Sequence, residues 1–188
     1  MNFRSPSRGL LFVLILATAA VWVLASAAPP ASSTGGIPAP QIGFQAPDIS
    51  LPAEDGTTIQ LADLRGRPVL VNFWASWCPP CRAEMPAMQQ VYQELSSQGV
   101  TILAINAANQ DDHAAALNFA QSLGLSFPIV YDQTGETSSR YAIRSLPTSF
   151  FVDSQGVIRG IIVGGMSEAA LRIRLRQLLE IVPTEPAP

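Results

Sequence analysis

The chain contains two cysteines, Cys78 and Cys81, which are separated by two prolines. A hydrophobic stretch (68–74) leads into them, and a helical pattern follows. A C-x-x-C at a strand-to-helix junction can close a small disulfide and open it again. Cysteines this close cannot connect distant parts of a fold, and the chain-entropy model gives so short a loop little stabilising effect. The spacing therefore predicts thiol–disulfide exchange.

Metal binding is the alternative chemistry for a C-x-x-C. A closed zinc site needs about four ligands, typically cysteine or histidine. The chain offers two cysteines and one histidine, His113, which lies in a different segment. Zinc would therefore need a second chain or carboxylate ligands, and we expect neither a metal nor a cofactor. We expect His113 to be a surface residue without a partner.

The position of Cys78 favours a reactive thiolate. It falls where the helix is expected to begin, and the unpaired backbone N–H groups and the helix dipole stabilise an anion there. Pro79 and Pro80 fit the first helical turn, where a missing N–H does no harm. They also remove two donors to the Cys78 sulfur and leave the N–H of Cys81. We therefore expect a moderately lowered pKa for the Cys78 thiol, which raises the fraction of attacking thiolate at neutral pH.

The N-terminus carries a targeting signal. Arg4 and Arg8 precede a largely apolar run (10–28), and no basic residue follows that run until Arg65. As a helix, the run would be about 28 Å long at about 1.5 Å per residue, near the minimum for a membrane span. The arginines before it agree with the positive-inside rule. We expect residues 1–9 in the cytoplasm and the remainder of the chain on the other side of the membrane.

Two interpretations of this run stay open. The first is an uncleaved signal anchor, which gives a single-pass membrane protein with an extracytoplasmic catalytic domain. The second is a cleaved signal peptide, because Ala25-Ser26-Ala27 is a small-residue cleavage site. Cleavage near Ala27 would give a secreted or periplasmic protein. We favour the anchor, and both interpretations export the domain.

Composition divides the rest of the chain into three parts. A Pro/Ser/Gly/Ala-rich segment (29–43) predicts a flexible linker, 44–182 a single domain, and 183–188 a Pro-rich tail. All 14 acidic residues follow the apolar run, against nine arginines (11 minus the two before it), so the exported part has a net charge of −5. That balance gives no support to nucleic-acid binding.

Apolar periodicity predicts the order of the elements in the domain. A short hairpin comes first, strands then alternate with helices, and an antiparallel hairpin and an amphipathic helix complete the domain. This order predicts an α/β fold, with helices on both faces of a mixed sheet. The expected strands are 49–51, 58–61, 69–74, 100–106, 127–131, 148–152 and 157–163, and the expected helices are 79–97, 111–123, 134–142 and 167–181.

Several motifs together indicate a family. They are Ala46-Pro47-Asp48, the run from Leu64 to Cys81, Glu84-Met85-Pro86 and Leu146-Pro147-Thr148. On these motifs, residues 44–181 resemble the thioredoxin fold. More narrowly, they are similar to the membrane-tethered, extracytoplasmic thiol–disulfide oxidoreductases of bacteria, of the TlpA/ResA/CcmG type. The resemblance implies a thioredoxin-like mixed central sheet with an N-terminal β-hairpin extension and a helical insertion.

The resemblance also implies roles for particular residues. Cys78 would be the exposed, attacking thiol, and Cys81 the more buried, resolving thiol. Pro147 matches the family's cis-proline, which packs against the disulfide and exposes backbone for a partner polypeptide, so we expect a cis Leu146–Pro147 bond. The client-binding surface would then comprise Trp77, Pro79, Pro80, Leu146 and Pro147.

Glu84 is a candidate general base. Thioredoxins carry a buried aspartate in the strand before the motif, where this chain has Asn72, which cannot exchange a proton at neutral pH. Glu84 matches an acidic residue typical of the tethered group, and it lies one helical turn beyond Cys81. Partial desolvation would raise its pKa and let it accept the Cys81 proton. The alternative is a solvated glutamate that interacts favourably with the helix dipole.

Three functions are compatible with these residues. The first is an oxidoreductase that reduces client disulfides; by resemblance its client would be apocytochrome c in cytochrome c maturation, and its electron donor a membrane thiol-transporting reductase. The second is a thiol peroxidase, but such peroxidases place Thr or Ser three residues before the reactive cysteine and Pro seven before it, where this chain has Ala75 and Val71. The third is a non-catalytic binding module with an idle disulfide.

Overall fold

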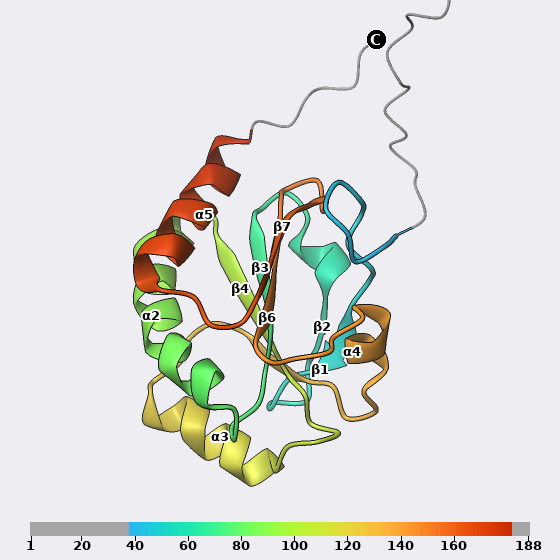
Figure 1. Cartoon of the computed structure of the whole chain (residues 1–188), viewed down its shortest axis with the longest axis vertical. Coiled ribbons are helices and arrows are strands. Elements are labelled where there is room, and N and C mark those ends of the chain that lie inside the picture. The colour runs from blue at the N-terminus through green and yellow to red at the C-terminus, as the bar shows by residue number, and fades with distance from the viewer. Residues whose placement is uncertain (1–37, 182–188) are drawn as a thin grey trace, which may run out of the picture. The chain divides into compact units, whose positions relative to one another are not determined.

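A five-stranded mixed sheet forms the centre of the domain in the computed structural model, which describes residues 38–181 (Figure 1). The strands lie in the order β5-β4-β3-β6-β7, with β3 parallel to β4, β4 parallel to β5, and β6 antiparallel to both β3 and β7. A separate two-stranded sheet precedes it. The strands are β1 (Ser50–Pro52), β2 (Thr58–Gln60), β3 (Val69–Trp74), β4 (Thr101–Asn106), β5 (Ile129–Tyr131), β6 (Thr148–Val152) and β7 (Ile158–Val163), and the helices are α2 (Pro79–Leu95), α3 (His113–Ser122), α4 (Glu136–Arg140) and α5 (Glu168–Glu180).

Strand β3 leads the chain to the cysteines. It is central in the sheet, and all six of its residues are buried, as its near-continuous apolar sequence predicts. Its alternate side chains point to opposite faces of the sheet, so that Leu70, Asn72 and Trp74 share the face that α2 covers. The strand therefore places a single polar side chain, Asn72, under the helix that begins at Cys78.

Helices cover both faces of the sheet, as expected. Helices α2, α3 and α5 pack on one face, around a core that includes Trp74, Met88 and Leu175 (Figure 1). The short α4 and the hairpin of β1 and β2 lie on the other face, over a second core with Phe73 and Tyr141. The predicted thioredoxin-like α/β class and the N-terminal hairpin extension are confirmed.

The domain begins earlier than the sequence predicts. Gly43 N–H donates to Ile158 O (2.8 Å), Ile158 N–H donates to Phe44 O (2.9 Å), and Ala39 N–H donates to Gln45 O (3.1 Å). Part of the expected linker (38–43) is thus hydrogen-bonded to the start of β7 or to its own neighbours. Proline- and glycine-rich composition indicated a linker, but it does not prevent backbone pairing with a strand edge.

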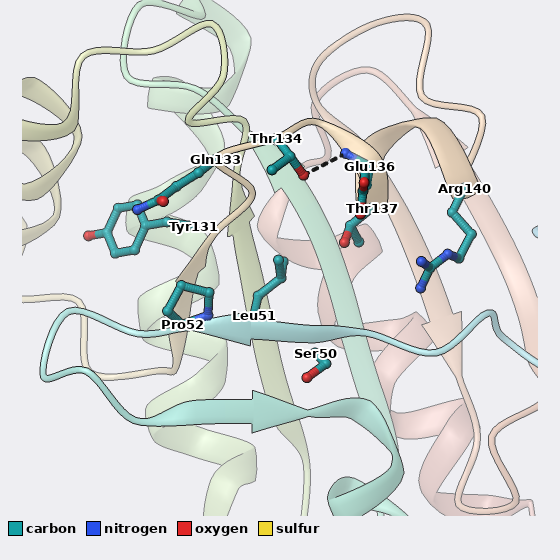
Figure 2. A pocket seen from close by; sticks show the side chains of 9 residues that line it. All are labelled: Ser50, Leu51, Pro52, Tyr131, Gln133, Thr134, Glu136, Thr137 and Arg140. Carbon is teal, nitrogen blue, oxygen red and sulfur yellow. Dashed lines mark hydrogen bonds between the residues drawn. The ribbon is translucent and has the colours of Figure 1, made fainter.

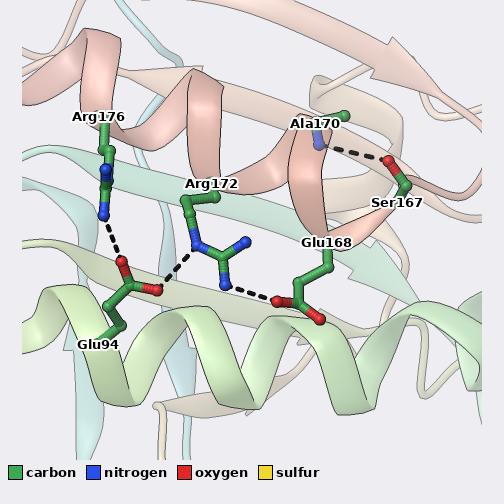
Figure 3. Close-up of polar contacts among 6 residues, drawn as sticks. All are labelled: Glu94, Ser167, Glu168, Ala170, Arg172 and Arg176. Atoms are coloured by element: carbon green, nitrogen blue, oxygen red, sulfur yellow. Dashed lines mark hydrogen bonds and ion pairs between the residues drawn. The ribbon is translucent and has the colours of Figure 1, made fainter.

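Ion pairs join α2 to α5 (Figure 3). Glu94 on α2 accepts from Arg172 Nε (2.8 Å) and from Arg176 Nη2 (2.5 Å), and Arg172 also pairs with Glu168 (2.5 Å). The hydrogen bonds from Arg172 and then Arg176 lower the pKa of the Glu94 carboxyl. All four side chains are at least partly exposed, so solvent screens their attraction.

We predict a small loss of stability for Glu94→Gln at neutral pH, no more than a few degrees in the midpoint of thermal unfolding. Because the pKa of Glu94 is lower in the folded state, its contribution exists above the unfolded-state pKa and disappears as the pH falls through the folded-state pKa. The difference from wild type should therefore vanish in acid, and it should shrink in high salt. Glu180→Gln is the control, because no ion pair of Glu180 is present among the described residues; an equal loss in both variants would contradict the prediction.

The predicted membrane segment (10–28) lies outside the described residues, as do most of the linker and the Pro-rich tail. Within residues 38–181, no helix is long and apolar enough to cross a membrane.

Candidate active site

The two cysteines form a disulfide at the start of α2. Cys78 is the N-cap residue, and Pro79 and Pro80 occupy the first helical turn, as predicted. The backbone N–H of Cys81 donates to Cys78 Sγ (3.3 Å). The structure therefore shows the expected donor to the Cys78 sulfur, the backbone N–H of Cys81.

Both sulfur-bearing residues are buried in this disulfide form. Cys78 is 2% exposed and Cys81 is 0% exposed. The expectation of an exposed Cys78 is therefore wrong for the oxidised protein, in which both cysteines belong to the buried core cluster on the α2 face of the sheet. Cys78 still retains the greater exposure of the two.

The loop before β6 lies beside this cluster. The Leu146–Pro147 bond is cis, as the resemblance implied. Pro147 O accepts a hydrogen bond from Gly164 N–H (2.8 Å). Within residues 38–181, the backbone N–H and C=O of Leu146 make no hydrogen bond, so both are available to an incoming polypeptide.

Trp77 is the large exposed apolar side chain at the site. It is 55% exposed, and its Nε1–H donates to Gln110 O (2.9 Å) in the loop before α3. Trp74, by contrast, is fully buried in the core. The structure thus separates the two tryptophans, and only Trp77 has a surface that a client could contact.

Glu84 belongs to a buried polar cluster rather than to the solvated face of α2. It is 3% exposed, and its carboxylate accepts from Asn72 Nδ2 (2.9 Å) and from the backbone N–H of Met166 (3.0 Å). Asn72 Nδ2 also donates to Ser149 Oγ (2.9 Å). Residues from β3 and the loop before α5 therefore meet at the Glu84 carboxylate of α2, and Asn72 connects it to Ser149 on β6.

Burial raises the pKa of the Glu84 carboxyl, and the hydrogen bonds from Met166 and Asn72 oppose part of that rise. The oxygen Oδ1 of Asn72 is buried without a partner. If the Asn72 amide turned over, this oxygen could accept from a protonated Glu84, whereas its present orientation donates to the ionised carboxylate. The cluster can therefore satisfy either protonation state of Glu84, as a proton acceptor requires.

Sequence reasoning missed Asp111 as part of the site. Its carboxylate accepts from the backbone N–H and the hydroxyl of Ser76 (both 2.6 Å) and from Asn106 Nδ2 (2.7 Å). Arg82 holds the same loop by donating to Ser76 O (3.1 Å). The only signal in the sequence was a pair of aspartates before a helix, and the second of them, Asp112, is the N-cap of α3. The first aspartate fixes the segment that carries Trp77 and Cys78.

We predict that Asp111→Ala destabilises the domain by about 1–3 kcal/mol, because it leaves partly buried donors on Ser76 and Asn106 unpaired. Urea unfolding measures the loss, and Trp77 fluorescence should report a changed environment. Asp63→Ala, at an exposed position, is the control and should stay within about 0.5 kcal/mol of wild type. Equal stability of the Asp111 and Asp63 variants would show that these contacts do not hold the loop.

His113 is on the surface, as expected, but it is not without a partner. Its Nε2 lies 3.0 Å from Glu54 Oε2, and its ring packs at a tilt against the Tyr131 ring, with the ring centroids 4.6 Å apart. The pairing joins the start of α3 to the turn of the N-terminal hairpin. The sequence did not indicate this contact, because Glu54 and His113 are 59 positions apart in the chain.

One cavity, of about 290 Å³, has no cysteine in its lining. Strand β1, the segment after β5, and α4 line it, with Leu51, Tyr131 and Arg140 among its residues (Figure 2). It holds no cluster of acids. Across residues 38–181, no three His, Cys, Asp or Glu side chains are arranged to hold a metal ion.

A dithiol–disulfide pair at a helix N-terminus, beside a cis-proline loop on a five-stranded mixed sheet, defines a thiol–disulfide oxidoreductase of the thioredoxin fold. Known proteins agree with this class. A family model described as AhpC/TSA matches residues 42–161. The chain belongs to that family.

Within this class, the chain is similar to individual thiol–disulfide oxidoreductases. The chain is 37% identical to the thiol-disulfide oxidoreductase ResA of Geobacillus thermodenitrificans, over 73% of this chain and 78% of the relative. A thiol:disulfide interchange protein of Chlorobium tepidum, solved by crystallography, superposes with a TM-score of 0.67 at 31% identity, covering 77% of this chain and 98% of its own. StoA from Bacillus subtilis superposes with a TM-score of 0.60 at 31% identity, over 68% and 96%.

Proposed function

We propose that this oxidoreductase works as a reductant of client disulfides outside the cytoplasm, held to the membrane by residues 10–28. The observation that carries the reductive direction is the chemistry around Cys78 Sγ, where Cys81 N–H is the backbone donor and prolines occupy the next positions of the turn. Because so few hydrogen-bond donors surround it, the Cys78 thiolate is stabilised only weakly. A weakly stabilised reduced form gives electrons away more readily, the opposite of a strong oxidant such as DsbA.

The reaction transfers two electrons in two steps. The Cys78 thiolate attacks one sulfur of the client disulfide, and the other client sulfur leaves as a thiolate. Glu84 then accepts the Cys81 proton, and the Cys81 thiolate attacks Cys78 Sγ. The second client sulfur leaves, and the Cys78–Cys81 disulfide forms. A thiol donor must return two electrons to begin another cycle.

The proposed client is apocytochrome c, and the proposed donor is a membrane thiol-transporting reductase. Support comes from the similarity to a protein named ResA and from the exported placement that the arginines and the apolar run indicate. The domain itself has no second cysteine pair to receive electrons, since Cys78 and Cys81 are the only cysteines in the chain. The reducing equivalents therefore come from outside the given sequence, and we propose a protein donor.

Equilibration of the full chain with glutathione buffers tests the direction. We predict a reduction potential nearer to the value of about −270 mV for thioredoxin than to the value of about −120 mV for DsbA. A potential near that of DsbA would instead make the protein an oxidant. Cell fractionation tests the placement, and N-terminal sequencing that begins at Ala28 would replace the anchor with a cleaved signal.

A further inference from the structure

One edge of the central sheet lies beside the active site, and within residues 38–181 its outward backbone groups there are unpaired. β7 is an edge strand that pairs only with β6 in the five-stranded sheet. We propose that the edge of β7 at Ile161 and Val163 binds an extended segment of the client polypeptide as an added strand. This rests on the proposed function, because it identifies where the client lies while its disulfide reacts with Cys78.

The hydrogen-bond register shows which backbone groups are free. Gly164 N–H bonds to Pro147 O, which makes residues 147 and 164 a hydrogen-bonded pair. Pairs alternate along antiparallel strands, so the next pair, Thr148 and Val163, points its N–H and C=O groups away from each other. The same holds for Phe150 and Ile161. The backbone of Val163 and Ile161 therefore faces outward, and no hydrogen bond of these outward groups is present in the described part of the chain.

The chain already shows that this edge accepts a strand. Ile158, at the start of β7, exchanges two backbone hydrogen bonds with Gly43 and Phe44, at 2.8 and 2.9 Å. Gln45 forms an antiparallel bridge with Val157. Within residues 38–181 the pairing of this added segment ends before Ile161, and no described strand pairs with the part of the edge that is closer to the active site.

A groove lies next to the open part of the edge and suits apolar side chains. Its volume is about 340 Å³, and its lining includes Phe150, Ile161 and Val163, together with Pro40 from the segment that pairs with the start of β7. Val163 is 67% exposed, the most exposed large apolar residue in the described part of the chain. Alternate side chains of an added strand point to the same face, so every second client residue could enter this groove.

Arg144 gives the groove its charge. It lines the groove, is exposed, and makes no ion pair within residues 38–181. The free guanidinium favours a client segment that carries an acidic residue among its apolar ones. The preferred partner is thus an extended, apolar segment with one acid, rather than a basic segment.

The edge leads directly to the reacting sulfurs. Gly165 follows β7 by two residues, and its Cβ position is 3.4 Å from Pro80 O, between the two cysteines in sequence. Two extended residues span about 7 Å. A client strand on β7 would therefore carry its disulfide to the cysteines within a few residues, next to the unpaired backbone of Leu146. This continuity with the reacting site makes the client, and not a second copy of the chain, the occupant.

The test uses the full chain and a linear peptide whose one cysteine is in a disulfide with glutathione, flanked by alternating valines and threonines. Two further peptides carry N-methyl groups on alternate backbone amides, one in each register. N-methylation removes donors from one side of a strand at a time. We expect one register to lower kcat/KM by about tenfold and the other to have little effect, whereas equal effects of the two registers would overturn the proposal.

Variants test the protein side of the contact. Val163→Lys places a charge at the edge, which blocks strand addition, and should lower kcat/KM for the peptide by about tenfold, or about 1.4 kcal/mol. Ile173→Lys is the matched control, because Ile173 is exposed to a similar degree (56%) on α5, and it should match wild type. Wild-type kinetics in Val163→Lys would overturn the proposal, as would an equal loss with glutathione disulfide, which has no strand to add.

Other occupants give different results in the same experiment. A dimer of the wild-type chain that Val163→Lys dissociates would assign the edge to a second copy. Faster peptide reduction after replacement of residues 29–37 by a glycine–serine sequence would assign it to the chain's own upstream segment. Either outcome would overturn the proposal. If wild type reduces neither the peptide nor glutathione disulfide, the proposed function itself fails. A defect with the peptide alone would contradict only the strand-addition proposal.

Discussion

Replacing Cys78 with serine should abolish disulfide exchange. Cys78 is the N-cap of α2, where the helix N-terminus favours a thiolate. A serine hydroxyl at that position is not ionised at neutral pH and forms no disulfide. We therefore expect no client reduction above the background of free thiols, measured as release of client thiols from the reduced protein.

The matched variant, Cys81→Ser, should behave differently. It keeps the attacking thiol but lacks the resolving one, so mixed disulfides between Cys78 and the client should accumulate. Both variants lose the disulfide, and any effect of that loss on folding is therefore common to them. Trapping by Cys78→Ser and not by Cys81→Ser would reverse the two roles.

The second large effect is expected for Glu84→Gln, which should slow exchange near neutral pH by about 100-fold. The substitution removes the buried carboxylate that we propose as the acceptor of the Cys81 proton. The packing should survive, because an Asn72 amide turned over could accept from the new amide and from Ser149. Client reduction and pH-dependent alkylation of the cysteines measure the effect.

The raised pKa of Glu84 sets the pH dependence. In wild type, exchange should weaken as the pH falls through that pKa, above the ordinary value of 4.5, because a protonated carboxyl cannot accept a proton. This limb should be absent in Glu84→Gln. For stability, a carboxyl whose pKa is raised on folding favours the folded state below its unfolded-state pKa, and loses that effect as the pH rises through the folded-state pKa.

Urea unfolding across this range should therefore show wild type losing stability relative to Glu84→Gln as the pH rises. Glu136→Gln, on the exposed start of α4, is the control for a glutamate outside the site. Superimposable alkylation curves and equal exchange rates in wild type and Glu84→Gln would leave Glu84 a structural carboxylate that ties α2 to Met166.

The sequence predicted the elements well because their signals are local. The near-continuous apolar run of β3 and the prolines at the start of α2 lie where expected, and the helix expected over 167–181 is α5 (Glu168–Glu180). The cis bond at Pro147 has no local signal, and it was predicted from resemblance alone. Glu84 also lacks a local signal, because its position on the helix gave no means to distinguish a solvated from a buried carboxylate.

The missed features depend on contacts between distant segments. Asp111 reaches Ser76 across 35 residues, and Glu84 reaches the backbone of Met166 across 82. The burial of Cys78 depends on a core cluster that combines residues from β3, α2, α3, β6 and α5. Periodicity and spacing describe one element at a time. The contacts of the active-site residues other than the cysteines could therefore be identified only from the three-dimensional fold.

Acid-quenched mass spectrometry of the reduced protein mixed with a disulfide-bonded client tests the central claim most directly. The account predicts that a mixed disulfide through Cys78 forms first and then disappears as the Cys78–Cys81 disulfide appears, with two client thiols released for each disulfide formed. A client reduced while both cysteines remain thiols, or an intermediate linked through Cys81, would contradict it.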